Sequence, residues 1–330
     1  MFTRFFLYIF ACLLCLAPAA AQCVGENLIA ALPEAERTAL YDAAHAAPFA
    51  TGNLWRATRG DETLILTGTF HLDDPRHDAY QARLLPLLAT AKTLLVEAGP
   101  EEEKALQQVL MTDSSAMIAP QGSGLKAALA PAEWDALADA LLQRAIPSSL
   151  AEMLRPWFVS MMLSIPPCAL QTAATGAGLD KRLIAAATEQ GIAIEALEPF
   201  DTALKLFDGL TMDEQLTMIR NALVVEQQSD DFLTTTAEAF FAGESRLIWE
   251  FSRRLAYDIP GNTPAQVDED FAKAEQALMS DRNRAWITEI EAALQNGPAF
   301  AAFGALHLSG TEGVLALLQD RGFEVVPLTD

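Results

Sequence analysis

The chain has 330 residues, of which 51% are apolar, and a formal net charge of −22. This length allows a substantial buried core, and the apolar content argues against a disordered chain. The acidity argues against nucleic acid as a partner, because phosphates are bound by clustered Lys and Arg, and against an anionic membrane surface. We therefore expect a folded protein whose substrate is a small molecule or a peptide.

Residues 1–21 have the pattern of a secretory signal peptide. Arg4 supplies a positive charge, residues 5–16 supply the apolar segment, and Ala19-Ala20-Ala21 fits the small-residue cleavage rule. The apolar run is too short to span a bilayer comfortably, and no later stretch reaches spanning length without charges. We expect cleavage after Ala21, no stable membrane anchor afterwards, and a periplasmic or secreted protein.

The chain has four cysteines, and two of them, Cys12 and Cys15, would leave with the signal peptide. Cys23 and Cys168 remain. In an oxidising compartment an even number of cysteines indicates a disulfide, which would tie the new N-terminus to the middle of the chain. The alternative is two unpaired thiols, with Cys168 buried beside the Pro166-Pro167 pair.

Apolar runs bounded by turn residues predict six short strands. They cover residues 53–58, 63–67, 93–97, 192–197, 299–303 and 323–327. The first two are joined by Arg59-Gly60-Asp61-Glu62, which is typical of a hairpin turn. Glu97 ends the third strand, and Gly99-Pro100 breaks the chain after it.

Most of the remaining chain has helical periodicity. The expected helices include residues 25–47 (one or two helices), 78–91, 131–144, 150–165 with a break at Pro156, 179–190 and about 311–321. Three capping boxes are expected to fix helix starts. They are Thr211-Met-Asp-Glu214, Thr263-Pro-Ala-Gln266 and Ser309-Gly-Thr-Glu312.

The order of these elements predicts an α/β fold in a single domain over residues 22–330, with a central mixed sheet and helices on its faces. The sheet would come from about residues 53–100, 176–200 and 298–330, and large helical insertions would occupy about 101–175 and 201–297. Two units repeat a strand, a Gly-x-x-His turn, a helix and a strand. Their turns are Gly68-Thr-Phe-His71 and Gly304-Ala-Leu-His307.

Four side chains follow expected strand ends, namely His71, Glu97, Glu198 and His307. Because ligands bind at the carboxyl ends of strands in α/β sheets, we expect these side chains to share one crevice. Two imidazoles with carboxylates are suitable ligands for a divalent transition metal such as zinc, manganese or cobalt. Such a metal lowers the pKa of bound water and supplies a nucleophile at neutral pH.

Each of these positions also has an ordinary structural interpretation. The two glycines can be plain turn residues and the two histidines can cap the helices that follow them. Glu97 can be an exposed strand end, and Glu198, which precedes a proline, can be the acid at a helix N-terminus. His45 has no matching context and is expected to be structural. Arg76 and His77 are expected to be solvated turn residues, with a role at the mouth of the cleft as the alternative.

In their order and spacing, several short motifs resemble the TraB/GumN family from about residue 53 to 328. The motifs are Gly68-Thr-Phe-His71, Leu95-Val-Glu97, Arg155-Pro156-Trp157, Gly178-Leu-Asp180, Leu197-Glu198, and Gly304-Ala-Leu-His307 followed by residues 313–326. That family is related to the Tiki metalloproteases, and more distantly to erythromycin esterases and the haem-binding ChaN proteins. The resemblance implies that the two motif histidines meet across a pseudo-symmetric cleft.

The resemblance also implies roles for single residues. His71 and His307 match the motif histidines, and Glu97 matches the acid after the second strand of the motif. Arg155 matches a basic residue whose guanidinium would hold a carboxylate or stabilise a developing oxyanion. The structural alternative for Arg155 is stacking on Trp157 or capping of a helix.

Asp180 and Glu198 match acidic positions of the family and are candidate metal ligands, although either can simply begin a helix. The Tiki proteins are anchored in a membrane, whereas this chain is expected to have no anchor after cleavage of the signal peptide, so their substrates are not carried over.

Three functions fit these features. The first is an exported metal-dependent hydrolase of peptide, amide or ester bonds. In it His71, His307 and Glu97 hold a metal or activate water, and Glu198 or Asp180 completes the site. The second is a non-catalytic protein that binds a metal or haem through the same histidines. The third is a metal-free esterase with His71 as general base. No Gly-x-Ser-x-Gly nucleophile elbow occurs in the chain.

Overall fold

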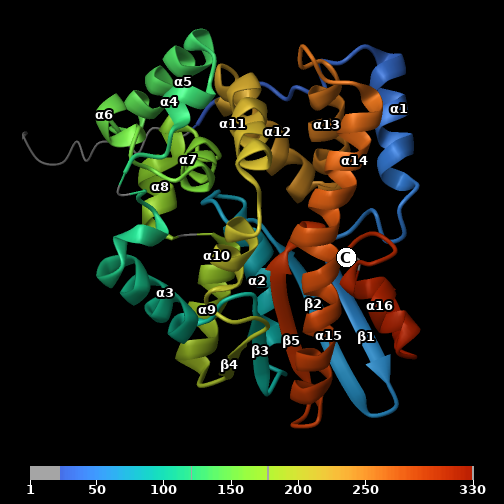
Figure 1. Ribbon diagram of the computed structural model, residues 1–330. Helices are drawn as coiled ribbons and strands as arrows, with labels where there is room; N and C mark the ends of the chain where they lie inside the picture. The colour runs from blue at the N-terminus through green and yellow to red at the C-terminus, as the bar shows by residue number, and fades with distance from the viewer. Residues whose placement is uncertain (1–22, 120, 177, 329–330) are drawn as a thin grey trace, which may run out of the picture.

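A computed structural model describes residues 23–119, 121–176 and 178–328. The expected signal peptide, its cleavage point and the cysteines at 12 and 15 lie outside the described residues. Figure 1 shows a sheet flanked by helices, with further helices stacked above it in that view. Within the described ranges, no helix combines the length and the hydropathy needed to cross a membrane.

Six strands form one mixed sheet in the order β4-β3-β5-β2-β1-β6. They are β1 (Leu54–Arg59), β2 (Glu62–Thr69), β3 (Thr93–Val96), β4 (Ala193–Ala196), β5 (Ala299–Gly304) and β6 (Glu324–Pro327). The pairs β2–β5, β3–β5 and β3–β4 are parallel, whereas β1 is antiparallel to both β2 and β6. The expected hairpin is confirmed, because Arg59 pairs with Glu62 around Gly60, which has a φ of 59°.

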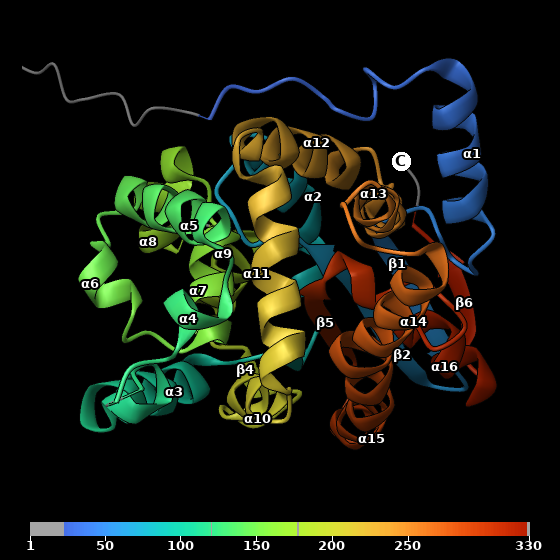
Figure 2. The same ribbon diagram turned by 45° about the horizontal axis from the view of Figure 1, so that its top comes forward.

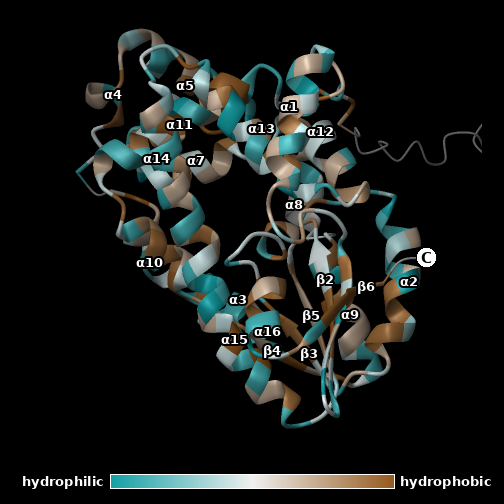
Figure 3. Cartoon of the chain, turned by 90° about the vertical axis from the view of Figure 1, so that its right-hand side faces the viewer, coloured by the Kyte–Doolittle hydropathy of each residue, from teal (hydrophilic) through white to brown (hydrophobic). Residues whose placement is uncertain are grey.

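Helices cover both faces of this sheet. They are α2 (His77–Leu88) and α9 (Leu179–Gln190) on one face, and α15 (Asp281–Leu294) and α16 (Val314–Asp320) on the other. Successive residues of a strand point to opposite faces. Accordingly Leu64 and Leu66 pack with the α15–α16 side, whereas Ile65 packs with the α2–α9 side. Figure 3 shows long hydrophobic stretches along these strands and mixed colouring on the helices.

The handedness of the connections explains why β5 lies between β2 and β3. The parallel crossovers β2-α2-β3 and β3-α9-β4 run outward over one face of the sheet, and α15 then returns over the other face to β5. Since parallel crossovers are almost always right-handed, a reversal of direction requires a change of face. The carboxyl ends of β2, β5 and β3 therefore lie side by side where the direction changes, which is where α/β sheets bind ligands.

Two helical insertions extend beyond these strand ends. The first holds α3 (Pro100–Thr112), η1 (Ser114–Ala116), α4 (Leu125–Ala128), α5 (Pro131–Gln143), α6 (Ser148–Ala151), α7 (Pro156–Leu163), η2 (Pro167–Ala169) and α8 (Leu170–Thr175). The second holds α10 (Thr202–Asp208), α11 (Met212–Glu226), α12 (Ser229–Phe241), α13 (Ser245–Tyr257), α14 (Pro264–Glu275) and the π-helix η3 (Gln276–Ser280). In Figure 2, α11 stands between the first group and α13–α14. An apolar cluster joins α11 to α5 and α7, and another joins α1 (Glu34–His45) to α12 and α13.

Two of the three expected helix starts are confirmed. The Thr211 hydroxyl accepts from the Glu214 amide, and the Thr263 hydroxyl accepts from the Gln266 amide. The third was wrong, because α16 begins at Val314 and not near Thr311. The chain before it is a tight turn in which the Gly313 amide donates to the Gly310 carbonyl over 3.1 Å.

The disulfide expected between Cys23 and Cys168 is present, with the two Cα atoms 5.3 Å apart at a sequence separation of 145. It ties the N-terminal segment to η2. The same segment lies against the start of α12, where the Glu26 amide donates to Asp231 Oδ1 over 2.7 Å. The bridge therefore connects the two insertions through the N-terminus.

A candidate active site at the carboxyl ends of the central strands

The two Gly-x-x-His turns lie side by side at the ends of β2 and β5. Their register is offset by one residue, since Thr69 pairs with Gly304. A Cβ on Gly68 would lie 2.7 Å from the Ala305 Cβ, so only glycine allows the short helix η4 (Ala305–His307) to approach β2 this closely. The first glycine of the pair thus lets the second turn fold onto the first.

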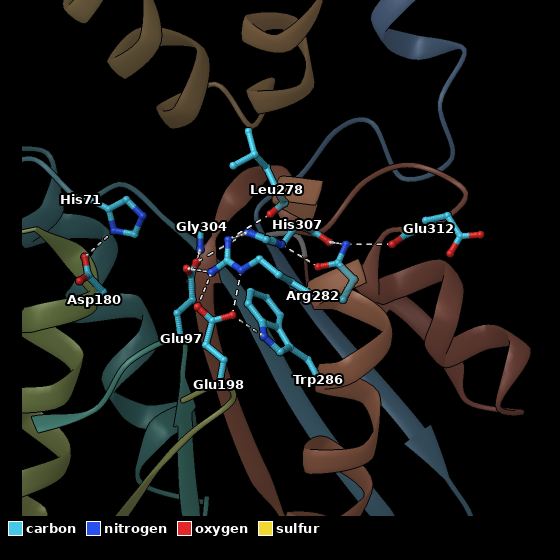
Figure 4. A network of polar contacts seen from close by, with 11 residues as sticks. His71, Glu97, Asp180, Glu198, Leu278, Arg282, Trp286, Gly304, His307 and Glu312 are labelled. Atoms are coloured by element: carbon cyan, nitrogen blue, oxygen red, sulfur yellow. Dashed lines mark hydrogen bonds and ion pairs between the residues drawn. The ribbon is translucent and has the colours of Figure 1, made fainter. Parts of the chain in front are cut away.

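Three of the candidate side chains converge on Gly304. A Cβ built on it would lie 3.2 Å from Glu97 Oε1, 3.5 Å from His71 Nε2 and 3.7 Å from His307 Cδ2. The Gly304 amide donates to Glu97 Oε1 over 2.7 Å. Of the four side chains expected to share one crevice, His71, Glu97 and His307 lie around Gly304, whereas Glu198 lies beneath Arg282 (Figure 4).

His307 is buried and is held as the neutral imidazole. Asn283 donates its amide to the Glu312 carbonyl over 2.8 Å, which leaves its Oδ1 to accept from His307 Nδ1 over 2.6 Å. The proton therefore lies on Nδ1, which leaves a lone pair on Nε2. Nε2 accepts a hydrogen bond from Arg282 over 3.2 Å and lies 3.9 Å from Glu97 Oε1. Burial, helped by the positive charge of Arg282, lowers the pKa of His307 to about 4.

Arg282 connects the two carboxylates. It donates from Nη2 to Glu97 Oε2 over 2.7 Å, and from Nε and Nη2 to the two oxygens of Glu198 over 2.8 Å each. Trp286 Nε1 also donates to Glu198 over 3.1 Å, and its ring packs against His307 at 4.4 Å between centroids. Burial raises the pKa of Glu97, but the charges of His307, His71 and Arg282 and the Gly304 amide lower it to about 2, a pH at which His307 is itself protonated.

His71 lies on the open side of the site. Its Nδ1 is 3.2 Å from Asp180 Oδ1, at the start of α9, and its side chain is 61% exposed. Crowding around the ring opposes protonation, but the hydrogen bond to Asp180 and the charges of Asp180 and Glu97 outweigh it and raise the pKa of His71 to about 9. The large exposure supports this direction, since a ring in contact with water loses little hydration. The two motif histidines therefore differ in charge near neutral pH.

A cavity of about 580 Å³ opens above these residues. His71, Glu97, Arg282 and His307 line its floor. Its walls are mostly apolar and come from α7, α11, α12, α13 and η3. This volume lies within the range of small-molecule sites, and a few charged groups in an apolar wall are typical of such sites.

The other expected site residues lie farther from Gly304. Glu198 lies beneath Arg282, and Asp180 lies behind His71 and contacts its Nδ1. Arg155 is not brought to this site, because its guanidinium donates to the Ser115 carbonyl over 2.6 Å and lies 3.7 Å from Asp208. Among the described residues that line the cavity, none of these three is present.

Sequence reasoning missed Arg282, Asn283 and Trp286. Arg282 and Trp286 are four residues apart and so share one face of α15, which was the only sign of them in the sequence. The π-helix η3 ends directly before α15, and such π-turns are frequent at functional sites.

The expectation of a solvated His77 was wrong. This ring is fully buried at the start of α2, bonds to the Leu72 carbonyl over 2.9 Å and packs against Phe241. The partner ring comes from α12, more than 150 residues away. His45, as expected, has a structural contact and pairs with Glu244 over 2.8 Å.

The donor set fits a divalent transition metal in kind and in orientation. In both motif histidines Nδ1 is engaged by a side-chain oxygen, from Asp180 or from Asn283, as in most histidines that bind a metal through Nε2. In spacing the set is looser. Within the described ranges, the only trio of His, Cys, Asp or Glu ligand atoms lying within 4.8 Å of one another is Cys23, Cys168 and Asp230. A metal would therefore require the exposed ring of His71 to move inward.

The fold and the site define an α/β protein with a histidine–carboxylate cleft at the carboxyl ends of its parallel strands. A comparison with protein families matches residues 53–327 to the TraB/PrgY/gumN family. The chain therefore belongs to that family. A search of curated proteins finds no match.

Proposed function

We propose that this protein is an exported metal-dependent hydrolase that cleaves peptide, amide or ester bonds. The observation that carries the proposal is the convergence of His71, Glu97 and His307 around Gly304 at the floor of an apolar cavity. Export is supported by the pattern of residues 1–21 and by the disulfide, since disulfides persist in oxidising compartments.

In this proposal His307 Nε2, Glu97 Oε1 and His71 Nε2 would hold the metal, and Asn283 and Asp180 would fix the two rings from behind. Because His71 carries a proton near neutral pH, metal binding would release that proton from Nε2. When bound, a divalent metal supplies an activated water at neutral pH and polarises a carbonyl oxygen. The depressed pKa values of His307 and Glu97 keep both groups ready to bind a cation at neutral pH.

Arg282 has two roles in the proposal. Its contacts with Glu97 and Glu198 fix the direction of the Glu97 carboxylate. Because it also lines the cavity, its positive charge lies near the position where an oxyanion would develop during attack on a carbonyl carbon. Glu198 accepts hydrogen bonds from Nε and Nη2 of Arg282 and so holds the guanidinium in position.

The test combines elemental analysis of the protein, purified from its own compartment, with hydrolysis of a panel of peptides, amides and esters. His307→Ala and Glu97→Gln should each lower both bound metal and hydrolysis by at least about tenfold. His45→Ala is the matched control, because that histidine pairs with Glu244 away from the site. Metal content and hydrolysis that stay at the wild-type level in both site variants would refute the proposal.

A non-catalytic protein that binds metal or haem through the same histidines is the second candidate. The observation that favours it is the apolar wall above two imidazoles, a setting that suits a flat apolar cofactor as well as a substrate. A haem absorption band or a tight stoichiometric metal, found together with no hydrolysis across the panel, would select this function over the first.

A further inference from the structure

The cavity above the site exposes apolar side chains that no other part of the described chain covers. Val225 of α11, Phe232 and Leu233 of α12, and Trp249 of α13 all line it and are only partly buried. A concave apolar surface of this kind is costly to leave in contact with water. Such a surface on a folded protein marks a binding site.

The polar groups of the cavity are concentrated near its floor, and one of them lacks a partner. Thr69 is 3% exposed, lines the cavity, and its hydroxyl has no hydrogen-bond partner in the protein. It pairs with Gly304 in the sheet and so lies between the two histidine turns. Because buried hydroxyls are nearly always hydrogen-bonded, this one is free to bind a polar group of a ligand. The Ser245 hydroxyl also lines the cavity without a partner.

The ligand implied by this arrangement has a neutral polar group at one end and an apolar remainder. The two cations at the floor, Arg282 and His71, already pair with three carboxylates, Glu97, Glu198 and Asp180, so the cluster does not favour a further anionic group. An extended peptide would bring one donor and one acceptor per residue into the cavity. The walls offer few partners for these groups, since the Ser164 and Thr236 hydroxyls already donate to backbone carbonyls and Ser245 supplies a single unpartnered hydroxyl.

We infer that the cavity binds the apolar acyl chain of an ester or amide substrate, with the carbonyl beside Thr69 and the chain between α11, α12 and α13. This inference rests on the proposed hydrolase function and narrows its substrate class. A hydrocarbon chain needs no hydrogen-bond partners, and its burial gains free energy with each methylene.

The test measures the affinity of N-methyl alkanamides from four to twelve carbons by isothermal titration calorimetry. The affinity should increase about fourfold with each added methylene until the cavity is full, which corresponds to ~0.8 kcal/mol per buried methylene. Val225→Trp should fill the cavity and weaken the longest amide by roughly fifteenfold, the equivalent of about two methylenes. Val224→Trp is the matched control, because Val224 is the next residue of α11, is 45% exposed and does not line the cavity.

The inference is overturned if affinity does not change with chain length, or if the two tryptophan variants bind alike. Hydrolysis of 4-nitrophenyl esters of the same chain lengths separates this failure from failure of the proposed function. Chain-length-dependent binding without hydrolysis leaves the cavity assignment standing and removes the hydrolase. Hydrolysis whose rate does not depend on chain length supports the hydrolase and overturns the assignment of the cavity to an acyl chain.

Discussion

Replacement of Arg282 by methionine tests how the site is held together. The guanidinium donates to both Glu97 and Glu198, and the three side chains are 14–22% exposed. Arg282→Met keeps much of the apolar stem but leaves two poorly hydrated carboxylates without their cation. Removal of one partner of a buried ion pair typically costs about 3–5 kcal/mol.

Because these groups keep some contact with water, we expect the lower end of that range, about 3 kcal/mol of unfolding free energy at pH 7.5. The loss should be smaller at pH 4. Arg282 lowers the pKa of both Glu97 and His307, so in the variant this pair takes up a proton more readily at pH 4 than it does in the wild type. In the wild type that pKa is about 2, so the stabilisation from Glu97 is complete above its unfolded pKa of about 4.5 and disappears as the pH falls toward 2.

Urea unfolding at both pH values measures these differences with the disulfide intact. Arg284→Met is the matched control, because Arg284 lies two residues along the same helix, is 45% exposed and pairs with the exposed residues Asp281 and Glu312. Exposed pairs contribute little, so the control should lose no more than about 1 kcal/mol. Equal losses in the two variants at pH 7.5 would refute the reasoning.

Three further predictions follow from the same contacts. Asn283→Leu removes the acceptor of His307 Nδ1 and should weaken zinc affinity about 10–100-fold in a competition titration, and an unchanged affinity would contradict the proposal that Asn283 orients the His307 ring. Replacement of both Cys23 and Cys168 by serine removes a link across 145 residues, worth up to about 5 kcal/mol in the chain-entropy account, and an unchanged urea midpoint would argue against it. The unfolded chain protonates its histidines near pH 6.5, but the pKa of folded His307 is about 4, so the unfolding free energy should fall by about 3 kcal/mol between pH 6.5 and pH 4. His307→Gln should reduce this dependence on pH. An identical dependence in the variant would contradict the assignment of a lowered pKa to His307.

Local sequence signals predicted the parts of the fold that depend on neighbouring residues. The hairpin around Gly60 and the helix start at Thr211 are examples, since a turn and a capping box are complete within four residues. The box beginning at Ser309 was wrong because the chain there turns against α15, where Asn283 donates to the Glu312 carbonyl. A capping pattern is therefore not sufficient where a distant side chain competes for the backbone.

Contacts between distant segments account for what the sequence did not reveal. His77 is buried because the aromatic end of α12 covers it, and nothing near residue 77 indicates that cover. Arg282 lies on α15, which covers the face of the sheet opposite to α2 and α9. Its contacts with Glu97 and Glu198 therefore depend on the crossover that places α15 on that face. The site residues found from sequence were those fixed by strand ends. The site residues that the sequence did not reveal, Arg282, Asn283 and Trp286, lie on α15, and the position of α15 over the site follows from the order of the strands in the sheet.

The central claim is that His71 and His307 act on one metal ion, and a cobalt titration tests it most directly. Binding of Co²⁺ would be measured by absorption in the wild type, His71→Ala, His307→Ala and the double variant, with His45→Ala as control. If both rings bind one ion, each single change should weaken binding at least about tenfold, and the two effects should not add, because residues of one site are coupled. The account is contradicted if both single variants bind Co²⁺ as the wild type and the His45 control do.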